Sequence, residues 1–263
     1  MRDIDPKMRS SGDPKYSVVV PVRDEAGNIA PLVGEIVAAM AGLEDAPPYE
    51  IIYVDDGSTD GTAIELDKAL QSTDQLKVAR HFQPCGQSQA LITGISAAEA
   101  PWVITLDGDG QNDPADITLL IEARGHAINQ EPELASQFLY VGHRRLRHDS
   151  LLRRYESWLA NDIRGWLLGD HTPDAGCGLK LFRRDLFLEL PRFDALHRFL
   201  PALVIRAGGR AISVEVSHRP RLRGKSKYGL WRRLALGVVD LLGVMWLITR
   251  QTRPQILHKK DTV

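Results

Sequence analysis

The stretch WVITLDGDGQ, residues 102–111, is an apolar run that ends abruptly in two aspartates one residue apart. Its apolar letters predict a buried strand over 102–106. Open α/β sheets bind ligands at the carboxyl ends of such strands, and here the sequence places Asp107, Asp109 and Gln111. Two carboxylates and an amide suit Mg²⁺ or Mn²⁺ held against a phosphate. A solvated turn rich in Gly and Asp explains the same letters, so this motif needs support from elsewhere in the chain.

Two earlier segments end in the same way. EIIYVDDGSTDGT, residues 50–62, is a strand pattern that Asp55 and Asp56 interrupt. YSVVVPVRDE, residues 16–25, is a strand pattern that runs into an Arg-Asp-Glu sequence. Each of these endings alone suits a hairpin or a loop. Together the three predict one cleft above a parallel sheet, and this cleft would hold a nucleotide and a metal.

The rest of the chain alternates strand and helix patterns, most clearly in its first half. The strands are expected over residues 16–21, 50–54, 76–80, 102–106, 138–143, 178–183 and 211–217. The helices are expected over residues 28–41, 62–70, 87–99, 114–124, 149–168, 198–207 and 230–249. The alternation predicts an α/β fold whose sheet is mostly parallel with right-handed crossovers, and the second half is more mixed.

The composition is that of a globular chain. Its 263 residues, 43% of them hydrophobic, can bury a sizeable core in one large α/β domain or two small ones. The formal net charge of -1 supplies no basic excess, which argues against nucleic acid as a partner. Cys85 and Cys177 suggest neither a disulfide framework nor a Cys-rich zinc site, and they fit a reduced cytoplasmic setting. Residues 1–14 are polar, lack the apolar core of a signal peptide and are expected to form a flexible tail.

Six motifs in this order resemble family-2 glycosyltransferases of the GT-A fold. Four of them lie in the first half: PVRDE at 21–25, VDDGSTDGT at 54–62, GQSQAL at 86–91 and LDGDGQNDP at 106–114. Two later stretches narrow the match, DAGCGLKLF at 174–182 and HRPRLRGKSKYG at 218–229. They are similar to the polyprenol-phosphate branch, which includes dolichyl-phosphate mannosyltransferases and bacterial polyprenyl-phosphate glycosyltransferases.

This resemblance implies an inverting glycosyltransferase in a Rossmann-like GT-A domain over residues 15–229. Such an enzyme moves a sugar from a nucleoside-diphosphate sugar to a polyprenyl phosphate with Mg²⁺ or Mn²⁺. The implied donor nucleotide-binding residues are Pro21, Asp24, Glu25, Asp55, Asp56, Asp107 and Ser226. The implied metal ligands are Asp107, Asp109 and Gln111. The implied catalytic residues are Asp109, Arg221 and Lys227.

The stretch RPRLRGKSKYGLWRR, residues 219–233, contains seven basic residues and no acid. A solvated basic loop is one interpretation. Its Gly-Lys-Ser sequence imitates the end of a P-loop, but Arg219 stands where that motif requires glycine, so a P-loop is rejected. Cationic donors match diphosphate oxygens, and a glycine lets the backbone approach them. Four residues have a spacing similar to the family's mobile loop over the donor diphosphate: Arg221, Gly224, Ser226 and Lys227.

For the acceptor phosphate, the resemblance indicates Arg144, Arg153 and Ser157. Arg153 and Ser157 share a face of the helix predicted over 149–168, although an ordinary amphipathic helix with exposed arginines has the same pattern. A phosphate monoester is mostly dianionic at neutral pH, so this acceptor needs positioning and no strong base. A saccharide or other hydroxyl acceptor is the alternative, and Asp174 would then be the base.

Other classes of protein fit the sequence less well. A sugar-phosphate nucleotidyltransferase shares the sheet and the acids but would carry a Gly-rich, Arg-containing loop after the first strand, which PVRDEAGN lacks. A non-catalytic nucleotide-binding module is disfavoured because the metal acids and the phosphate loop are both present. His197 and Arg198 precede the apolar FLPALVI, and we interpret them as helix-cap residues rather than ligands.

The C-terminal segment, residues 230–263, begins with an apolar helical pattern over 230–249 that contains Arg232, Arg233 and Asp240. Its uninterrupted apolar part is shorter than the ~20 residues of a transmembrane helix. A helix packed on the core and an amphipathic helix in the membrane interface both explain it. The polyprenyl phosphate favours a peripheral protein on the inner face of the membrane, where an integral-membrane protein is a further candidate partner.

Overall fold

The computed structural model describes residues 13–132, 134–144, 164–220 and 230–250, with side chains of the last segment from residue 237 onward. The chain divides into two compact units, Met1–Lys227 and Tyr228–Val263. The described part of the first unit holds a seven-stranded sheet flanked by helices. The second unit holds one described helix, α8 (Leu230–Thr249). No helix among the described residues has both the length and the hydropathy that a membrane span requires.

The sheet combines parallel strands with one antiparallel strand. Its strands are β1 (Tyr16–Val22), β2 (Tyr49–Asp55), β3 (Leu76–Arg80), β4 (Trp102–Thr105), β5 (Phe138–Arg144), β6 (Lys180–Arg183) and β7 (Arg210–Val216). Their order across the sheet is β3-β2-β1-β4-β6-β5-β7. β6 runs antiparallel to both of its neighbours, and the other adjacent pairs are parallel. The predicted α/β fold with a mostly parallel sheet is therefore confirmed.

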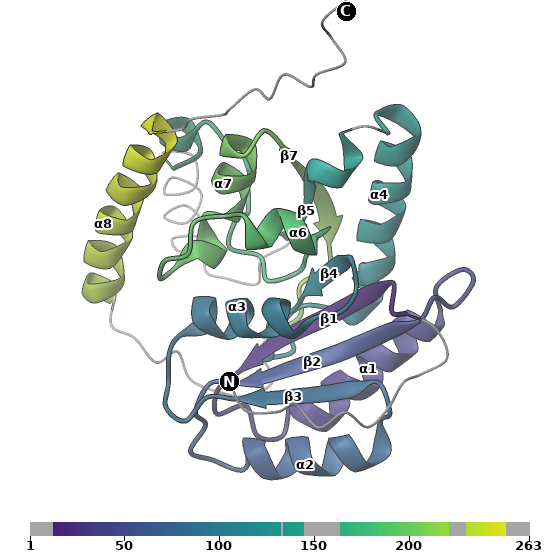
Figure 1. The fold of residues 1–263 in the computed structure, drawn as a ribbon. Coiled ribbons are helices and arrows are strands. Elements are labelled where there is room, and N and C mark those ends of the chain that lie inside the picture. The colour runs from purple at the N-terminus through teal and green to yellow at the C-terminus, as the bar shows by residue number, and fades with distance from the viewer. Residues whose placement is uncertain (1–12, 133, 145–163, 221–229, 251–263) are drawn as a thin grey trace, which may run out of the picture. The chain divides into compact units, whose positions relative to one another are not determined.

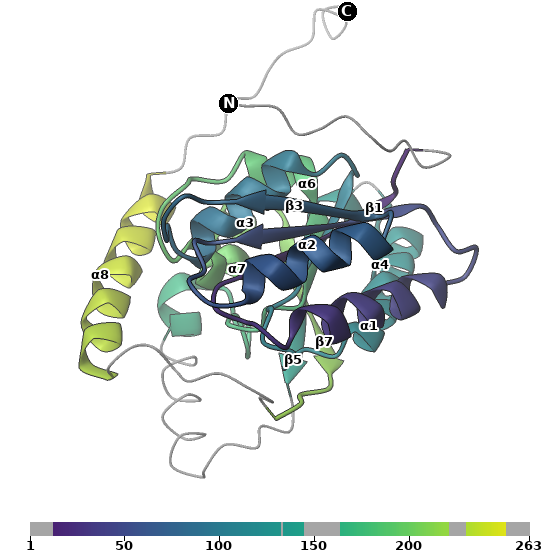
Figure 2. The same ribbon diagram turned by 90° about the horizontal axis from the view of Figure 1, so that it is seen from below.

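Helices cover both faces of this sheet. They are α1 (Ile29–Ala41), α2 (Thr62–Ser72), α3 (Gln87–Ala97), α4 (Ile117–Gln130), α6 (Arg184–Leu188) and α7 (Leu200–Arg206). Figures 1 and 2 show α1, α2 and α4 on one face and α3, α6 and α7 on the other. Because both faces are covered, every residue of β1 is buried and the strand reads as a continuous apolar run.

The expected elements agree with the observed ones except at a few ends. α1 follows from its pattern, since its buried residues recur at helical spacing: Ile29, Leu32, Val33, Ile36 and Met40. The short helix α6 was not expected, because five residues are too few to show a period. Of the helix predicted over 149–168, residues 164–168 are helical, and residues 149–163 lie outside the described part of the chain.

Candidate active site

The sheet topology brings the functional segments together at the carboxyl ends of the parallel strands, which are called here the carboxyl edge of the sheet. β1, β2 and β4 are parallel, so the residues that follow them leave the sheet on the same side. β6 is antiparallel to β4 and β5, and it therefore begins at this edge, where Lys180 pairs with Thr105 and with Val141. The ends of β5 and β7 lie here as well, because those two strands are parallel to each other and β5 runs in the same direction as β4. This edge is where open α/β sheets bind their ligands.

Asp107 stands just beyond β4, against the loop that precedes β6. Its Oδ1 accepts a hydrogen bond of 2.8 Å from Nε2 of Gln87, at the start of α3. A Cβ atom on Gly178 would lie 2.3 Å from Oδ2 of Asp107, so only a glycine allows this close approach. Asp109, two residues further on, is 8% exposed. Its Oδ1 accepts the backbone N–H of Gln111 at 3.1 Å, which holds the three predicted metal ligands in one turn.

The electrostatics of this turn favour a cation. Burial, and then the neighbouring Asp109 carboxylate, raise the pKa of Asp107. A divalent cation at the two carboxylates would replace their mutual repulsion by attraction and would stabilise their charged forms. The oxygen-only donor set is the one that Mg²⁺ and Mn²⁺ prefer. Residues 107–111, called here the DGDGQ turn, therefore fit such an ion.

The loops after β1 and β2 are joined to each other. Asp24 has a left-handed backbone with φ 51°, and its Oδ1 accepts the Thr59 backbone N–H at 2.8 Å. The Asp24 N–H in turn donates to Oγ of Ser58 at 2.9 Å. Asp55, buried at the end of β2, accepts the Ser58 N–H at 2.9 Å. These contacts bring Asp24, Asp55 and the adjoining Glu25 together at the ends of two paired strands.

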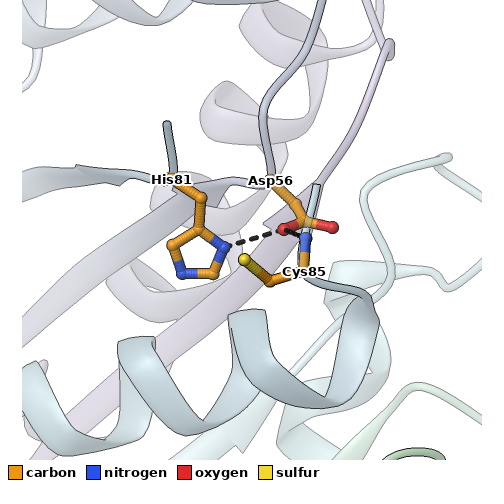
Figure 3. A group of neighbouring side chains, drawn as sticks. All are labelled: Asp56, His81 and Cys85. Atoms are coloured by element: carbon orange, nitrogen blue, oxygen red, sulfur yellow. Dashed lines mark hydrogen bonds and ion pairs between the residues drawn. The ribbon is translucent and has the colours of Figure 1, made fainter. Parts of the chain in front are cut away.

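Asp56 anchors the loop that leads into α3. Its Oδ1 accepts from Nδ1 of His81 and from the Cys85 backbone N–H, both at 2.7 Å (Figure 3). Its Oδ2 accepts the Gly86 N–H at 2.8 Å. Burial raises the pKa of Asp56, but these hydrogen bonds outweigh it and hold the pKa below its usual value. Nε2 of His81 lies 2.9 Å from Oγ1 of Thr93, which fixes the ring.

The Asp56, His81 and Cys85 ligand atoms lie within 4.8 Å of one another, a spacing that could also hold a metal ion. Three N–H groups already satisfy the two oxygens of Asp56 without a metal. Because a buried carboxylate that accepts several N–H bonds is stabilised by them, we interpret this cluster as a hydrogen-bonded anchor of the loop.

Arg144 and Asp174 form a buried ion pair at the same edge. Nε of Arg144 lies 2.6 Å from Oδ2 of Asp174, and Nη2 lies 2.8 Å from Oδ1. The two side chains are 15% and 4% exposed. Burial opposes the guanidinium charge, but the pair with Asp174 outweighs it and raises the pKa of Arg144. This bidentate pair engages both oxygens of Asp174.

Of the remaining residues predicted for the site, the structure describes one, Pro21. Pro21 is buried in β1, where it pairs with Val54 of β2. The other predicted residues lie outside the described part of the chain: Arg153, Ser157, Arg221, Ser226 and Lys227. The start of the basic stretch is described, and there the Arg219 N–H donates to the Gln111 carbonyl at 3.0 Å. This bond joins the basic stretch to the DGDGQ turn.

A cavity of about 220 Å³ lies beside Asp107, and its lining includes residues with no role predicted from the sequence. Its polar lining residues are Gln87, Thr105, Asp107, Lys180, His197 and Arg198. The interpretation of His197 and Arg198 as cap residues is wrong, because Phe199 is the N-cap of α7 and no side-chain cap bond forms there. Nδ1 of His197 instead lies 2.8 Å from Oγ of Ser88. Lys180 lies inside the apolar sequence LKLF, and this unusual position for a lysine could have indicated a role in the site. No local pattern indicates the contact between Ser88 and His197.

Comparisons with known proteins agree with this geometry. The family model for glycosyl transferase family 2 matches residues 17–190. A dodecaprenyl-phosphate galacturonate synthase from Rhizobium johnstonii is 34% identical over 255 residues, which cover 94% of this chain and 72% of that protein. An undecaprenyl-phosphate 4-deoxy-4-formamido-L-arabinose transferase from Aeromonas hydrophila is 34% identical over 230 residues, which cover 87% of this chain and 67% of that protein.

Solved structures share the fold at lower identity. A mannosyltransferase from Pyrobaculum calidifontis in complex with GDP-Man and Mn²⁺ has a TM-score of 0.61 and 19% identity, over 93% of this chain and 67% of that chain. Glucosyl-3-phosphoglycerate synthase from Mycobacterium tuberculosis, in complex with Mn²⁺, UDP and phosphoglyceric acid, has a TM-score of 0.63 and 19% identity, over 95% and 85%. The matching family model, the curated relatives and the GT-A architecture together show that this chain belongs to glycosyl transferase family 2.

Proposed function

We propose that this protein is an inverting glycosyltransferase that moves a sugar from a nucleoside-diphosphate sugar to a polyprenyl phosphate. The observation that carries the proposal is the convergence of the DGDGQ turn, the joined loops after β1 and β2, and the Arg144–Asp174 pair at one sheet edge. The two curated relatives, whose names state polyprenyl-phosphate acceptors, support the acceptor class.

The donor nucleotide would lie over the ends of β1 and β2. Asp24, Glu25 and Asp55 supply carboxylates there, and Pro21 shapes the floor beneath them. Asp56 would serve the same site indirectly, because it fixes the loop before α3 rather than offering a free oxygen. Neutral donor groups of a nucleoside base or ribose match carboxylate acceptors.

A divalent cation, Mg²⁺ or Mn²⁺, would be held by Asp107 and Asp109 with Gln111 in the same turn. When bound, such an ion neutralises the diphosphate as its charge rises during bond cleavage. Gln87 orients Asp107 through the hydrogen bond of 2.8 Å. Asp109 is the residue whose loss we expect to affect transfer most, because it is the more deeply buried of the two carboxylates.

The diphosphate would also meet the basic stretch. Arg221, Ser226 and Lys227 follow Arg219 along the chain, and the backbone of Arg219 is hydrogen-bonded to the DGDGQ turn. We infer that these residues bind the leaving diphosphate. Cations at that position stabilise the charge that develops as the glycosidic bond breaks, so they act on the transition state more than on the bound donor.

The acceptor phosphate would approach from the side of Arg144, with Arg153 and Ser157 as further contacts. One phosphate oxygen attacks the anomeric carbon as the bond to the diphosphate breaks, and the configuration inverts. This nucleophile is already ionised at neutral pH and gives up no proton. The pairing of Asp174 with Arg144 supports this reading over a hydroxyl acceptor, which would need Asp174 as a base.

We further propose that α8 contacts the membrane surface in which the lipid acceptor resides, on the inner face of the membrane. Val238, Leu242 and Trp246 recur every fourth residue, and their exposed fractions are 56%, 60% and 60%. Exposed apolar side chains on one helix face match the acyl boundary of a bilayer. Flotation with lipid vesicles should fall when Leu242 and Trp246 are changed to glutamate. Unchanged flotation would refute lipid contact and leave an integral-membrane partner as the alternative.

Transfer itself is tested with lipid-product mass spectrometry. The protein is incubated with Mg²⁺ or Mn²⁺, a panel of nucleoside-diphosphate sugars and either polyprenyl phosphate or the corresponding free polyprenol. We expect a glycosylated product only from the phosphate, and only with metal. Asp109→Asn serves as the inactive control. Glycosylation of the free polyprenol, or of a saccharide in its place, would contradict the proposed acceptor.

A further inference from the structure

We propose that the cavity beside Asp107 holds the donor sugar and selects a sugar that carries a carboxylate, a hexuronic acid. The inference rests on the proposed function, which it deepens by naming the class of sugar. The two curated relatives are named for an acidic sugar and for a formamido sugar, so their names leave this class open.

The cavity has the position and size for one sugar ring. It is lined by Asp107 of the DGDGQ turn and lies at the sheet edge, next to the acids that fit the metal. Its volume of about 220 Å³ lies below the ~300–1,000 Å³ of pockets that hold drug-sized ligands, which suits a single monosaccharide. A sugar attached to a diphosphate held at Asp107 and Asp109 would lie next to this cavity.

Lys180 supplies a cation that lacks a matching anion. Its side chain is buried, with 3% of the residue exposed, and among the described residues its ammonium donates one hydrogen bond, to the neutral Cys177 carbonyl. Burial lowers the pKa of Lys180, and the charges that oppose this effect include the acids Asp107 and Asp174. Asp174 is already paired with Arg144, and Asp107 belongs to the proposed metal site. Burying an ammonium without a counter-charge is unfavourable, so a ligand carboxylate would meet an existing need.

Arg198 adds a second cation at the rim of the same cavity. Its side chain is exposed, and it has no ion pair or side-chain hydrogen bond among the described residues. The guanidinium presents its donors in a planar fork that matches a carboxylate. With Asp107 assigned to the metal, the other charged groups that line the cavity in the described part of the chain are Lys180 and Arg198, and both are basic.

His197 contributes a neutral donor. Burial lowers the pKa of His197 to about 3, so the ring is uncharged at neutral pH. Oγ of Ser88 accepts the His197 backbone N–H at 3.4 Å and lies 2.8 Å from Nδ1. Because a hydroxyl can donate one hydrogen bond and accept two, the Ser88 contact fits either tautomer, and the neutral ring carries one N–H in both.

The lining is therefore rich in hydrogen-bond donors. A carboxylate is the sugar substituent that only accepts hydrogen bonds. A sugar hydroxyl both donates and accepts, so it satisfies one donor while presenting a hydrogen to the next. The cationic groups of Lys180 and Arg198 match a carboxylate with its several acceptor sites better than they match a hydroxymethyl group.

Pairs of nucleoside-diphosphate sugars that differ only at C6 of the sugar test the inference. We would measure binding of UDP-glucuronate against UDP-glucose, and of UDP-galacturonate against UDP-galactose, by calorimetry with Mg²⁺ and without acceptor. In at least one pair the uronate should bind at least about tenfold tighter, the usual effect of a hydrogen bond to a charged group. Equal affinities in both pairs, including no binding of either member, would overturn the inference.

Variants then assign the preference to the cavity. Lys180→Met and Arg198→Gln should each lower the ratio of uronate to neutral-sugar affinity by about tenfold. Arg192→Gln is the matched control, since Arg192 is an exposed arginine that precedes η3 (Leu196–Arg198) and does not line the cavity. Arg198 is exposed, so its variant should fold even if Lys180→Met does not. A ratio that survives in Arg198→Gln and in folded Lys180→Met would refute the assignment. If the uronate preference is present but no lipid product forms, the proposed acceptor fails and the inference about the sugar stands.

Discussion

Replacing Gly178 by alanine would test how the site holds Asp107. The added Cβ would lie 2.3 Å from Cγ and Oδ2 of Asp107 and 2.6 Å from Oδ1. Ordinary van der Waals contact begins at 3.4 Å, so the carboxylate or the loop must move by about 1 Å. Gly178 does not have a left-handed backbone, and alanine therefore acts through this contact alone.

The size of the effect follows from that displacement. A misplacement of about 1 Å in a catalytic constellation costs on the order of 10²-fold in rate. Overpacking of this kind costs about 1–3 kcal/mol of stability, which a domain of this size can absorb. We therefore expect Gly178→Ala to lose about 10²-fold in kcat while remaining folded at 25 °C, with a raised metal concentration for half-maximal activity.

Gly176→Ala is the matched control in the same loop. Within the part of the chain that the structure describes, its Cβ would meet Oδ1 of Asp174 alone, at 3.9 Å, which is an ordinary contact. The assay is the transfer rate as a function of Mn²⁺ concentration, with thermal unfolding of each variant measured in parallel. Wild-type kinetics in Gly178→Ala, or an equal loss in Gly176→Ala, would refute the reasoning that Gly178 sets the position of Asp107.

Four further predictions concern other parts of the site. Asp109→Asn should lower the transfer rate by about 10²–10³-fold without unfolding the protein, and near-normal rates at saturating Mg²⁺ or Mn²⁺ would rule out the metal role. Arg221→Ala and Lys227→Ala should each lower kcat as well as donor affinity, and steady-state kinetics that match wild type with every active donor would remove them from the diphosphate site. Asp174→Asn should cost less than the ~10²–10⁴-fold typical of a lost general base, whereas a larger loss in kcat would indicate a hydroxyl acceptor. Because burial lowers the pKa of His197 to about 3, while an unfolded histidine binds its proton near ~6.5, stability should fall as the pH drops below that value. Relative to His197→Gln, urea unfolding should show an extra loss of up to about 2 kcal/mol between pH 7 and pH 5, and parallel pH profiles would contradict a neutral buried ring.

The sequence carried enough information to predict the elements of the fold. Each observed strand lies within two residues of its expected position, because short runs rich in β-branched and apolar residues, bounded by turn residues, are local signals. The turn after β4 was also predictable, since Asp107, Asp109 and Gln111 lie within five consecutive positions. Local spacing alone brings such residues together.

Local patterns did not carry the long-range contacts of the site. β6 runs antiparallel between β4 and β5, and this direction brings Lys180 to the carboxyl edge. No residue near Lys180 in the sequence indicates that direction. The contact between Ser88 and His197 joins residues 109 positions apart, and a sequence pattern has no period of that length. For the same reason His197 was interpreted as a cap residue, although its side chain lines the cavity.

The sequence by itself determined which chemical groups this protein has and at which strand ends they stand, because residue order fixes the side chains that come after each apolar run. The tertiary structure alone decided how those groups pair. In the folded chain Asp56 accepts hydrogen bonds from the loop before α3, and Asp174 pairs with Arg144. Lys180 is buried and donates to the neutral Cys177 carbonyl. Each of these outcomes depends on distances between segments that are remote in the chain, and only the packing of the sheet and its helices sets those distances.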